Sequence, residues 1–306
     1  MSTVLATTSS FGRPELFELL EEAGLNIVLN PWRRKLTEDE LCMLLEKNKP
    51  VGLLAGTEPI TRPVLEAASG YLRIISRVGV GWDNVDREAA VQMGMKVYRT
   101  TGVLSEAVAE LTIGLILSAL RFISLSDRQI RNQCWEKHMG RLLAEKTVGI
   151  IGFGSIGRRV GELVDAFGAR VIYHDCNAYD IPRAEAVSLA ELLERADIIS
   201  VHASGKEMIL GPEELKKLKR PGVILVNTAR GSLIDEHALS KCLQDGRIGF
   251  ACLDVFQNEP YTGPLSSLEN VILTPHIGSY AREARELMER KAVENLLTGI
   301  RAFESK

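Results

Sequence analysis

The stretch V-G-I-I-G-F-G-S-I-G, residues 148–157, decides the fold. An apolar, β-branched run leads directly into a G-x-G-x-x-G loop, which opens a helical segment at Ser155. The first glycine, Gly152, allows a tight turn, the second, Gly154, lets a pyrophosphate approach the backbone, and the third, Gly157, lets helix and strand pack closely. The stretch therefore predicts a strand–turn–helix unit that binds a dinucleotide.

An acidic residue ends the next strand-like run, residues 171–174. Asp175 lies eighteen residues beyond Gly157, where a carboxylate can accept hydrogen bonds from both hydroxyls of a ribose. Cys176 and Asn177 follow it, and no arginine stands beside them to receive a 2′-phosphate. We therefore expect NAD rather than NADP; glycines that serve packing only are the alternative.

Short β-branched runs alternate with amphipathic segments along nearly the whole chain. This alternation is typical of parallel sheets that carry helices on both faces. Strand-like runs in the first part are residues 4–7, 26–29, 51–55 and 73–78. In the second part they are residues 148–151, 171–174, 197–202, 223–227, 250–255 and 271–273. We expect an α/β protein with two doubly wound parallel sheets.

The length indicates two domains, because 306 residues exceed the size at which one hydrophobic core usually stops growing. The final amphipathic stretch, residues 281–301, follows the last strand and can cross back to the first half. We predict a discontinuous, flavodoxin-like substrate domain, residues 1–98 and 281–306. A Rossmann NAD-binding domain, residues 99–280, is inserted into it.

The composition is that of an ordinary globular protein. Apolar residues make up 45% and charged residues 25%, and 37 basic against 40 acidic residues leave a net charge of −3. This balance argues against nucleic-acid binding, which needs a clustered excess of Lys and Arg. The longest apolar stretch, residues 111–120, is too short to cross a bilayer. Five cysteines without a C-x-x-C pair favour a reduced, cytoplasmic chain, and no residue set has metal-ligand spacing.

One helical segment, residues 105–121, is apolar almost all round. Its only charges before the last residue are Glu106 and Glu110. Such a helix is buried on more than one side. Two interpretations stay open at this point: a central helix between the domains, and a helix at the contact between two copies of the chain.

Residues able to bind or react follow the strands of the second half. They are Gly152, Asp175, His202, Arg230, Asp254 with Glu259, and His276. Core packing does not predict such a series. Because ligands of open parallel sheets bind beyond the carboxyl ends of the strands, the series indicates a site at that edge.

Arg230 and His276 are the strongest catalytic candidates. The guanidinium of Arg230 can grip a carboxylate and a carbonyl oxygen together; a surface arginine paired with Asp235 is the alternative. His276 stands between a proline and a glycine, and Glu259 is its natural partner, because a carboxylate orients an imidazole that must protonate a developing alkoxide. The remaining histidines are expected to be structural: His138, His174, His202 and His237.

A further glycine loop, V-G-V-G-W-D-N-V-D at residues 78–86, ends the last strand of the first half. Consecutive exposed amides at such a turn form a small anion nest that fits a carboxylate. A plain turn between strand and helix is the alternative.

Together these motifs resemble the D-isomer-specific 2-hydroxyacid dehydrogenase family. The resemblance rests on the G-x-G-x-x-G with Asp175, N-T-A-R-G at residues 227–231, D-V-F-Q-N-E-P at residues 254–260 and T-P-H-I-G at residues 274–278. The loop at residues 78–86 is similar to that of the short form of the D-3-phosphoglycerate dehydrogenase-like branch. The match runs from about residue 3 to about residue 303.

The resemblance implies an NAD-dependent oxidoreductase that interconverts a 2-keto acid and a D-2-hydroxy acid by hydride transfer. It implies a catalytic triad in which Arg230 orients the keto acid, His276 moves the proton and Glu259 holds His276. The NAD contacts that it implies are Gly152, Gly154, Ser155, Ile156, Gly157, Asp175, Thr228, Ala229, Asp254 and Gly278.

The resemblance also concerns substrate and assembly. It implies that Val80 and Gly81 offer amides to the substrate carboxylate, that Arg77 occupies a basic position usable for phosphate, and that the protein is a homodimer through its NAD-binding domain. Two segments depart from the family pattern, H-A-S-G at residues 202–205 and A-G-T-E at residues 55–58. The substrate stays open between D-3-phosphoglycerate/3-phosphohydroxypyruvate and glycerate/hydroxypyruvate. An NAD(H)-sensing, corepressor-like binding protein is the alternative function.

Overall fold

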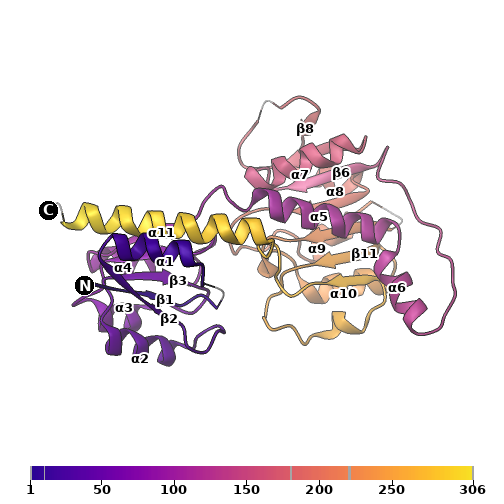
Figure 1. Cartoon of the computed structure of the whole chain (residues 1–306). Coiled ribbons are helices and arrows are strands. Elements are labelled where there is room, and N and C mark those ends of the chain that lie inside the picture. The colour runs from indigo at the N-terminus through magenta and orange to yellow at the C-terminus, as the bar shows by residue number, and fades with distance from the viewer. Residues whose placement is uncertain (1, 10, 180, 220–221, 305–306) are drawn as a thin grey trace. The chain divides into compact units, whose positions relative to one another are not determined.

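A computed structural model describes residues 2–9, 11–179, 181–219 and 222–304 (Figure 1). The chain divides into two compact units, Met1–Leu104 with Arg282–Lys306, and Ser105–Ala281. Each unit is built around a parallel sheet, which confirms the predicted fold class. The boundary expected at residues 98/99 falls inside a strand, Lys96–Arg99, that the sequence analysis did not identify and that stays with its neighbours in the first sheet.

The first unit contains a five-stranded parallel sheet with the order β2-β1-β3-β4-β5. This is the flavodoxin-like order. In the centre of the sheet, Val4 is opposite Ile27 on one side and Gly52 on the other. Its elements are β1 Ser2–Ala6, α1 Pro14–Glu22, β2 Leu25–Leu29, α2 Glu38–Asn48, β3 Gly52–Ala55, α3 Arg62–Ala68, β4 Ile74–Arg77, α4 Arg87–Gln92, β5 Lys96–Arg99 and α11 Arg282–Glu304.

Helices cover both faces of this sheet. Alternate residues of a strand point to opposite faces, so Leu5 packs with α2, α3 and α4, whereas Val4 packs with α1 and α11. The C-terminal helix α11 lies close to the strands. A Cβ on Gly52 of β3 would stand only 2.8 Å from a methyl carbon of Leu296, so glycine allows this close approach. The last helix of the chain therefore completes the core of the first unit, beside α1 (Figure 1).

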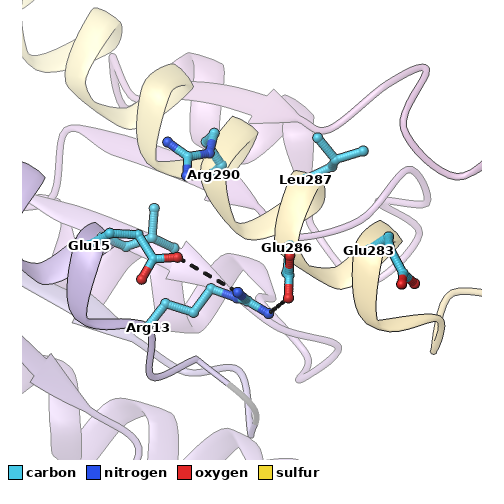
Figure 2. Close-up of a pocket in the computed structure, with 7 residues that line it drawn as sticks. Arg13, Glu15, Glu283, Glu286, Leu287 and Arg290 are labelled. Atoms are coloured by element: carbon cyan, nitrogen blue, oxygen red, sulfur yellow. Dashed lines mark hydrogen bonds and ion pairs between the residues drawn. The ribbon is translucent and has the colours of Figure 1, made fainter.

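An ion-pair cluster joins the start of α1 to α11. Figure 2 shows the guanidinium of Arg13 between Glu15 and Glu286, and Nη2 of Arg13 stands 2.6 Å from Glu286 Oε1. Arg13 also approaches a buried carboxylate, because its Nε lies 3.6 Å from Glu289 Oε2. Arg285 approaches the same carboxylate from within α11. These contacts fix the first half of α11, directly after the point where the chain returns to the first unit.

The second unit contains a seven-stranded parallel sheet with the order β12-β11-β10-β9-β6-β7-β8. This is the Rossmann order with one strand added. Its elements are α5 Ser105–Leu120, α6 Ile123–Arg131, β6 Thr147–Ile151, α7 Ser155–Ala166, β7 Arg170–His174, β8 Ala184–Ala186, α8 Leu189–Arg195, β9 Ile198–Val201, α9 Pro212–Lys216, β10 Val223–Asn227, α10 Glu236–Gln244, β11 Ile248–Leu253 and β12 Val271–Leu273, with 3-10 turns at Gly231–Leu233 and Pro264–Ser267. The short edge strand β8 was not predicted.

The apolar helix α5 is buried inside its own unit. It packs on α7, β10 and β11, and Ile113 and Ile116 belong to one hydrophobic cluster with Val148 and Phe250. Its apolar surface is therefore largely explained by the core of the second unit. No single helix of the described chain is long and apolar enough to span a membrane; α5 and α6 pass that test only as a pair, with a 63° bend between them.

Candidate functional site

The residues predicted in the second half gather at the carboxyl ends of neighbouring strands of one sheet. Parallel pairing brings the ends of β6, β7, β9, β10, β11 and β12 to the same edge. The glycine loop follows β6, Asp175 follows β7, and Arg230 lies three residues after β10. Asp254 directly follows β11, and His276 stands three residues after β12.

The glycine loop has the geometry of a phosphate-binding turn. Gly152 adopts a φ of +88°, and a Cβ there would collide with the backbone of Ala203. A Cβ on Gly157 would collide with the carbonyl oxygen of Gly152, whereas Gly154 has no other residue within 4 Å of its Cβ position. The open space at Gly154 lies at the start of α7, where the first amides of a helix lack internal acceptors and attract anions. These features fit a bound pyrophosphate.

Asp175 stands next to this loop as an ionised group. Burial alone would raise the pKa of its carboxyl, but hydrogen bonds from the amides of Asn177 and Phe153 outweigh burial, and the pKa lies below its ordinary value. Phe153 N donates to Oδ2 at 2.6 Å, so the glycine loop itself fixes the carboxylate. An ionised acid in this position fits the hydroxyls of the adenosine ribose.

A turn built by Asn227 presents Arg230. The amide side chain of Asn227 accepts a hydrogen bond from Ala229 N at 3.0 Å and donates one to Arg230 O at 2.9 Å. Arg230 Nη1 donates to Ala229 O at 2.7 Å. A Cβ on Gly231 would collide with the carbonyl group of Phe256. The arginine turn therefore packs on the loop that carries Glu259.

His276 and Glu259 form the pair that the sequence predicts. Nδ1 of His276 stands 2.8 Å from Glu259 Oε2, and the other carboxylate oxygen accepts a hydrogen bond from Phe256 N at 3.1 Å. Both side chains are partly exposed, 49% for His276 and 37% for Glu259. Within the described residues, Nε2 of His276 has no hydrogen-bond partner, so this ring nitrogen can face a ligand. The pair has the geometry of an oriented acid–base group.

Asp254 holds the loop that carries His276. This residue is 1% exposed. One carboxylate oxygen accepts hydrogen bonds from Thr274 Oγ1 at 2.6 Å and from Ile277 N at 2.8 Å, and the other accepts one from Gly278 N at 2.8 Å. The contact of Asp254 with NAD that the family resemblance implies stays a prediction. Its support of the loop could not be found from the sequence, because that role depends on contacts between residues twenty and more positions apart.

A second feature that the sequence analysis missed is a polar chain behind Thr228. Thr228 Oγ1 lies 3.1 Å from Thr112 Oγ1 of α5 and 3.5 Å from Nδ1 of His202. Nε2 of His202 stands 2.7 Å from Ser200 Oγ. Burial lowers the pKa of His202 to about 3, so the ring is neutral at physiological pH. His202, expected to be only structural, thus supports a residue of the N-T-A-R-G turn.

The glycine loop of the first unit leaves two amides available. Gly79 is held at both ends, since its N–H donates to Arg77 O at 3.0 Å and its carbonyl accepts from Thr100 N at 3.1 Å. In the described part of the chain, Val80 N and Gly81 N have no acceptor. This arrangement is that of an anion nest.

Two charged side chains of the first unit are turned into its loops. Arg77 is 9% exposed, donates to Val78 O, and lies so close to Gly79 that a Cβ there would collide with its guanidinium. Glu58 is 1% exposed and accepts hydrogen bonds from the hydroxyl of Thr7 and, at 3.0 Å, from Gly56 N. Neither side chain extends from the surface of the unit.

Comparisons with known proteins identify the family of the chain. The sequence profile of the D-isomer specific 2-hydroxyacid dehydrogenase NAD binding domain matches residues 113–278. The chain is 37% identical to a glyoxylate reductase of Thermococcus litoralis over 93% of both chains. It is 39% identical to a D-3-phosphoglycerate dehydrogenase of Methanocaldococcus jannaschii, over 89% of this chain and 53% of that protein. The crystal structure of the TT0316 protein from Thermus thermophilus superposes with a TM-score of 0.90 at 37% identity, covering 98% of this chain and 97% of that one.

These relatives are named as enzymes, which supports a dehydrogenase over a corepressor-like binding protein. The profile match identifies the second unit as an NAD-binding domain. The chain belongs to the D-isomer-specific 2-hydroxyacid dehydrogenase family, the NAD-dependent oxidoreductases that interconvert 2-keto acids and D-2-hydroxy acids.

Proposed function

We propose that this protein reduces small, unphosphorylated 2-keto acids of the glyoxylate and hydroxypyruvate class to D-2-hydroxy acids. The observation that carries the proposal is the His276–Glu259 pair, 2.8 Å apart, at the sheet edge that also holds the glycine loop and Arg230. A glyoxylate reductase is 37% identical over nearly the whole chain.

Arg230, His276 and Glu259 divide the work on the substrate. The planar guanidinium of Arg230 binds the keto acid and polarises its carbonyl oxygen. The nicotinamide cofactor, when bound, would supply the hydride as NADH or accept it as NAD⁺. As the carbonyl oxygen becomes an alkoxide, Nε2 of His276 donates a proton to it, and Glu259 stabilises the imidazolium before that transfer. In the oxidation direction His276 takes the proton back.

Backbone groups hold the remaining parts of substrate and cofactor. Val80 and Gly81 offer their amides to the substrate carboxylate. Ser155 and Ile156 at the start of α7 bind the pyrophosphate, and Asp175 binds the adenosine ribose. The further cofactor contacts in this proposal are Gly152, Gly154, Gly157, Thr228, Ala229 and Gly278.

The first-unit loops favour a substrate without phosphate. A phosphate carries up to two negative charges and needs a cation that reaches it. Residues 55–58 supply no cation, and the carboxylate of Glu58 is occupied inside its own loop. Arg77, the one basic candidate of the sequence analysis in this unit, is buried against Gly79. Short keto acids need only the amide nest and Arg230.

We also propose a homodimer through the second unit. Because the core of the second unit covers most of the apolar surface of α5, we place the dimer contact on α6 and the segment that follows it. There, Trp135 is 82% exposed and Met139 is 94% exposed, and Ile123, Ile130 and Leu142 are exposed as well. An apolar series of this kind marks an interaction site.

Two exposed free thiols, Cys134 and Cys176, favour a reducing, cytoplasmic compartment.

A substrate panel tests the assignment. With NADH, kcat/KM for glyoxylate and hydroxypyruvate should exceed that for 3-phosphohydroxypyruvate by about tenfold or more, because neither Arg77 nor residues 55–58 offer a cation to the phosphate of the substrate. The measurement is NADH oxidation at 340 nm at fixed ionic strength. A preference for 3-phosphohydroxypyruvate would refute the proposed substrate class, whereas no turnover with any 2-keto acid would refute the proposed activity.

Replacing the proton donor should remove most turnover. His276→Ala should lower kcat for glyoxylate by roughly 10² to 10⁴, the usual contribution of a general acid. The matched control is His237→Ala, because His237 is exposed on α10 and takes no part in the proposed site. Equal kcat values for wild type and His276→Ala would contradict the role of His276.

The proposed dimer depends on the apolar side chains after α6. The double variant Trp135→Ser/Met139→Ser should shift the mass measured by light scattering at micromolar concentration from dimer to monomer. Val91→Ser is the control, because Val91 is an exposed apolar residue of the first unit. A wild-type chain that runs as a monomer would disprove the dimer.

A further inference from the structure

A cleft of the first unit contains cationic side chains that the proposed reaction does not use. It lies between α4 and β5, has a volume of about 580 Å³, and is lined by Trp82, Arg87 and Lys96 together with apolar side chains. Trp82 directly follows the glycine loop residue Gly81. We call this the Trp82 cleft.

Two arginines share the indole ring of Trp82. The guanidinium carbon of Arg87 lies 4.3 Å from the ring centroid, and that of Arg99 lies 4.2 Å from it. Each contact is a cation–π interaction. The two guanidinium carbons are therefore at most about 8.5 Å apart. This separation is comparable to the Debye length of about 8 Å at physiological salt, so salt does not fully screen the repulsion between the two charges. An anion at this place would relieve the repulsion.

Arg87 and Lys96, which line the Trp82 cleft, and Arg99, which contacts the ring of Trp82, form no salt bridge with any residue that the structure describes. Arg159 of the second unit, by contrast, pairs with Glu106 at 2.7 Å and with Glu162 at 2.8 Å. Asp86, close in sequence to Arg87, instead caps α4 by accepting a hydrogen bond from Ala89 N at 2.9 Å. In a chain with a net charge of −3, this local excess of positive charge stands out.

The walls of the cleft suit an organic ligand. Val91, Met95 and Val97 contribute apolar surface to its lining, and Val91 is 70% exposed. An anionic group at the cations would therefore have apolar surface beside it for a carbon skeleton. A guanidinium group can donate hydrogen bonds to two phosphate oxygens at once, and the ammonium group of Lys96 adds a further donor.

Arg99, which contacts Trp82, also contacts Val80 of the proposed substrate loop. Arg99 Nη1 lies 3.5 Å from Val80 O, and its backbone carbonyl accepts a hydrogen bond from Asn295 Nδ2 at 3.2 Å. The backbone of Arg99 is thus fixed while its guanidinium reaches both Trp82 and Val80. A ligand that draws this guanidinium into the cleft would release Val80 O.

We propose that the Trp82 cleft binds an organic phosphate and that its occupancy weakens binding of the keto acid at Val80 and Gly81. The first part stands on the geometry of the cleft alone. The second part rests on the proposed function, because it needs Val80 to contact substrate. The coupling is reciprocal, so the keto acid also weakens binding of the phosphate ligand.

Titration calorimetry tests the site directly. Phenyl phosphate, inorganic phosphate and citrate are titrated into the full chain saturated with NAD, at ionic strength held constant with NaCl. Phenyl phosphate should bind most tightly because it combines phosphate with an apolar body. Arg87→Gln/Lys96→Gln should weaken its binding about tenfold or more, since charge-assisted hydrogen bonds are lost. Arg73→Gln is the matched control, an arginine placed 5.4 Å from the ring of Phe303 in the same unit.

The outcomes separate the two parts of the proposal. Absence of saturable phenyl phosphate binding at millimolar concentrations, equal binding by the double variant, or tighter binding of citrate would overturn the site. With binding established, phenyl phosphate should raise the KM for glyoxylate at least about twofold in wild type and leave it unchanged in the double variant, whose basal kcat stays at the wild-type value. An unchanged KM in wild type would overturn the coupling. A wild-type chain that does not reduce glyoxylate refutes the proposed function and leaves the calorimetric result intact.

Discussion

The buried carboxylate of Asp254 is the contact on which the catalytic edge depends. Its backbone N–H donates to Asn227 O on the neighbouring strand, and its side chain accepts three hydrogen bonds from residues 274–278. One residue thereby joins the rigid sheet to the loop that carries His276. That histidine has a φ of +54°, a conformation that costs a residue with a side chain free energy of order 1 kcal/mol or more. The carboxylate provides the compensating contacts.

The sequence predicts features with local signals and misses those that depend on distant contacts. The strand of residues 148–151, the glycine loop and the helix that begins at Ser155 follow from neighbouring residues, and the structure has each of them. The role of His202 depends on Thr228 and on Thr112, which lies 116 residues from Thr228. The edge strand β5 was missed because K-V-Y-R mixes charged and apolar residues without a buried run. Its absence from the prediction also explains the boundary set at residue 98.

Close backbone contacts explain why glycines occur at so many points of the site. Gly152, Gly157 and Gly231 each stand where a Cβ would collide with the backbone of another turn. The phosphate loop, the arginine turn and the loop of Glu259 are therefore positioned by backbone packing and not by flexible side chains. Such support favours a site with a fixed geometry. In the first unit, charged side chains support the loops: Arg77 donates a hydrogen bond to Val78 O, and Glu58 accepts one from Gly56 N.

Asp254 acts by holding the His276 loop. Asp254→Asn keeps one acceptor oxygen but turns an N–H₂ group toward a backbone N–H, so the loop loses at least one charge-assisted hydrogen bond. Steady-state kinetics at saturating NADH should show kcat for glyoxylate reduced about tenfold or more, with the Kd of NADH within about twofold of wild type. A folded variant with wild-type kcat and weakened NADH binding would contradict the account and assign Asp254 to direct cofactor contact.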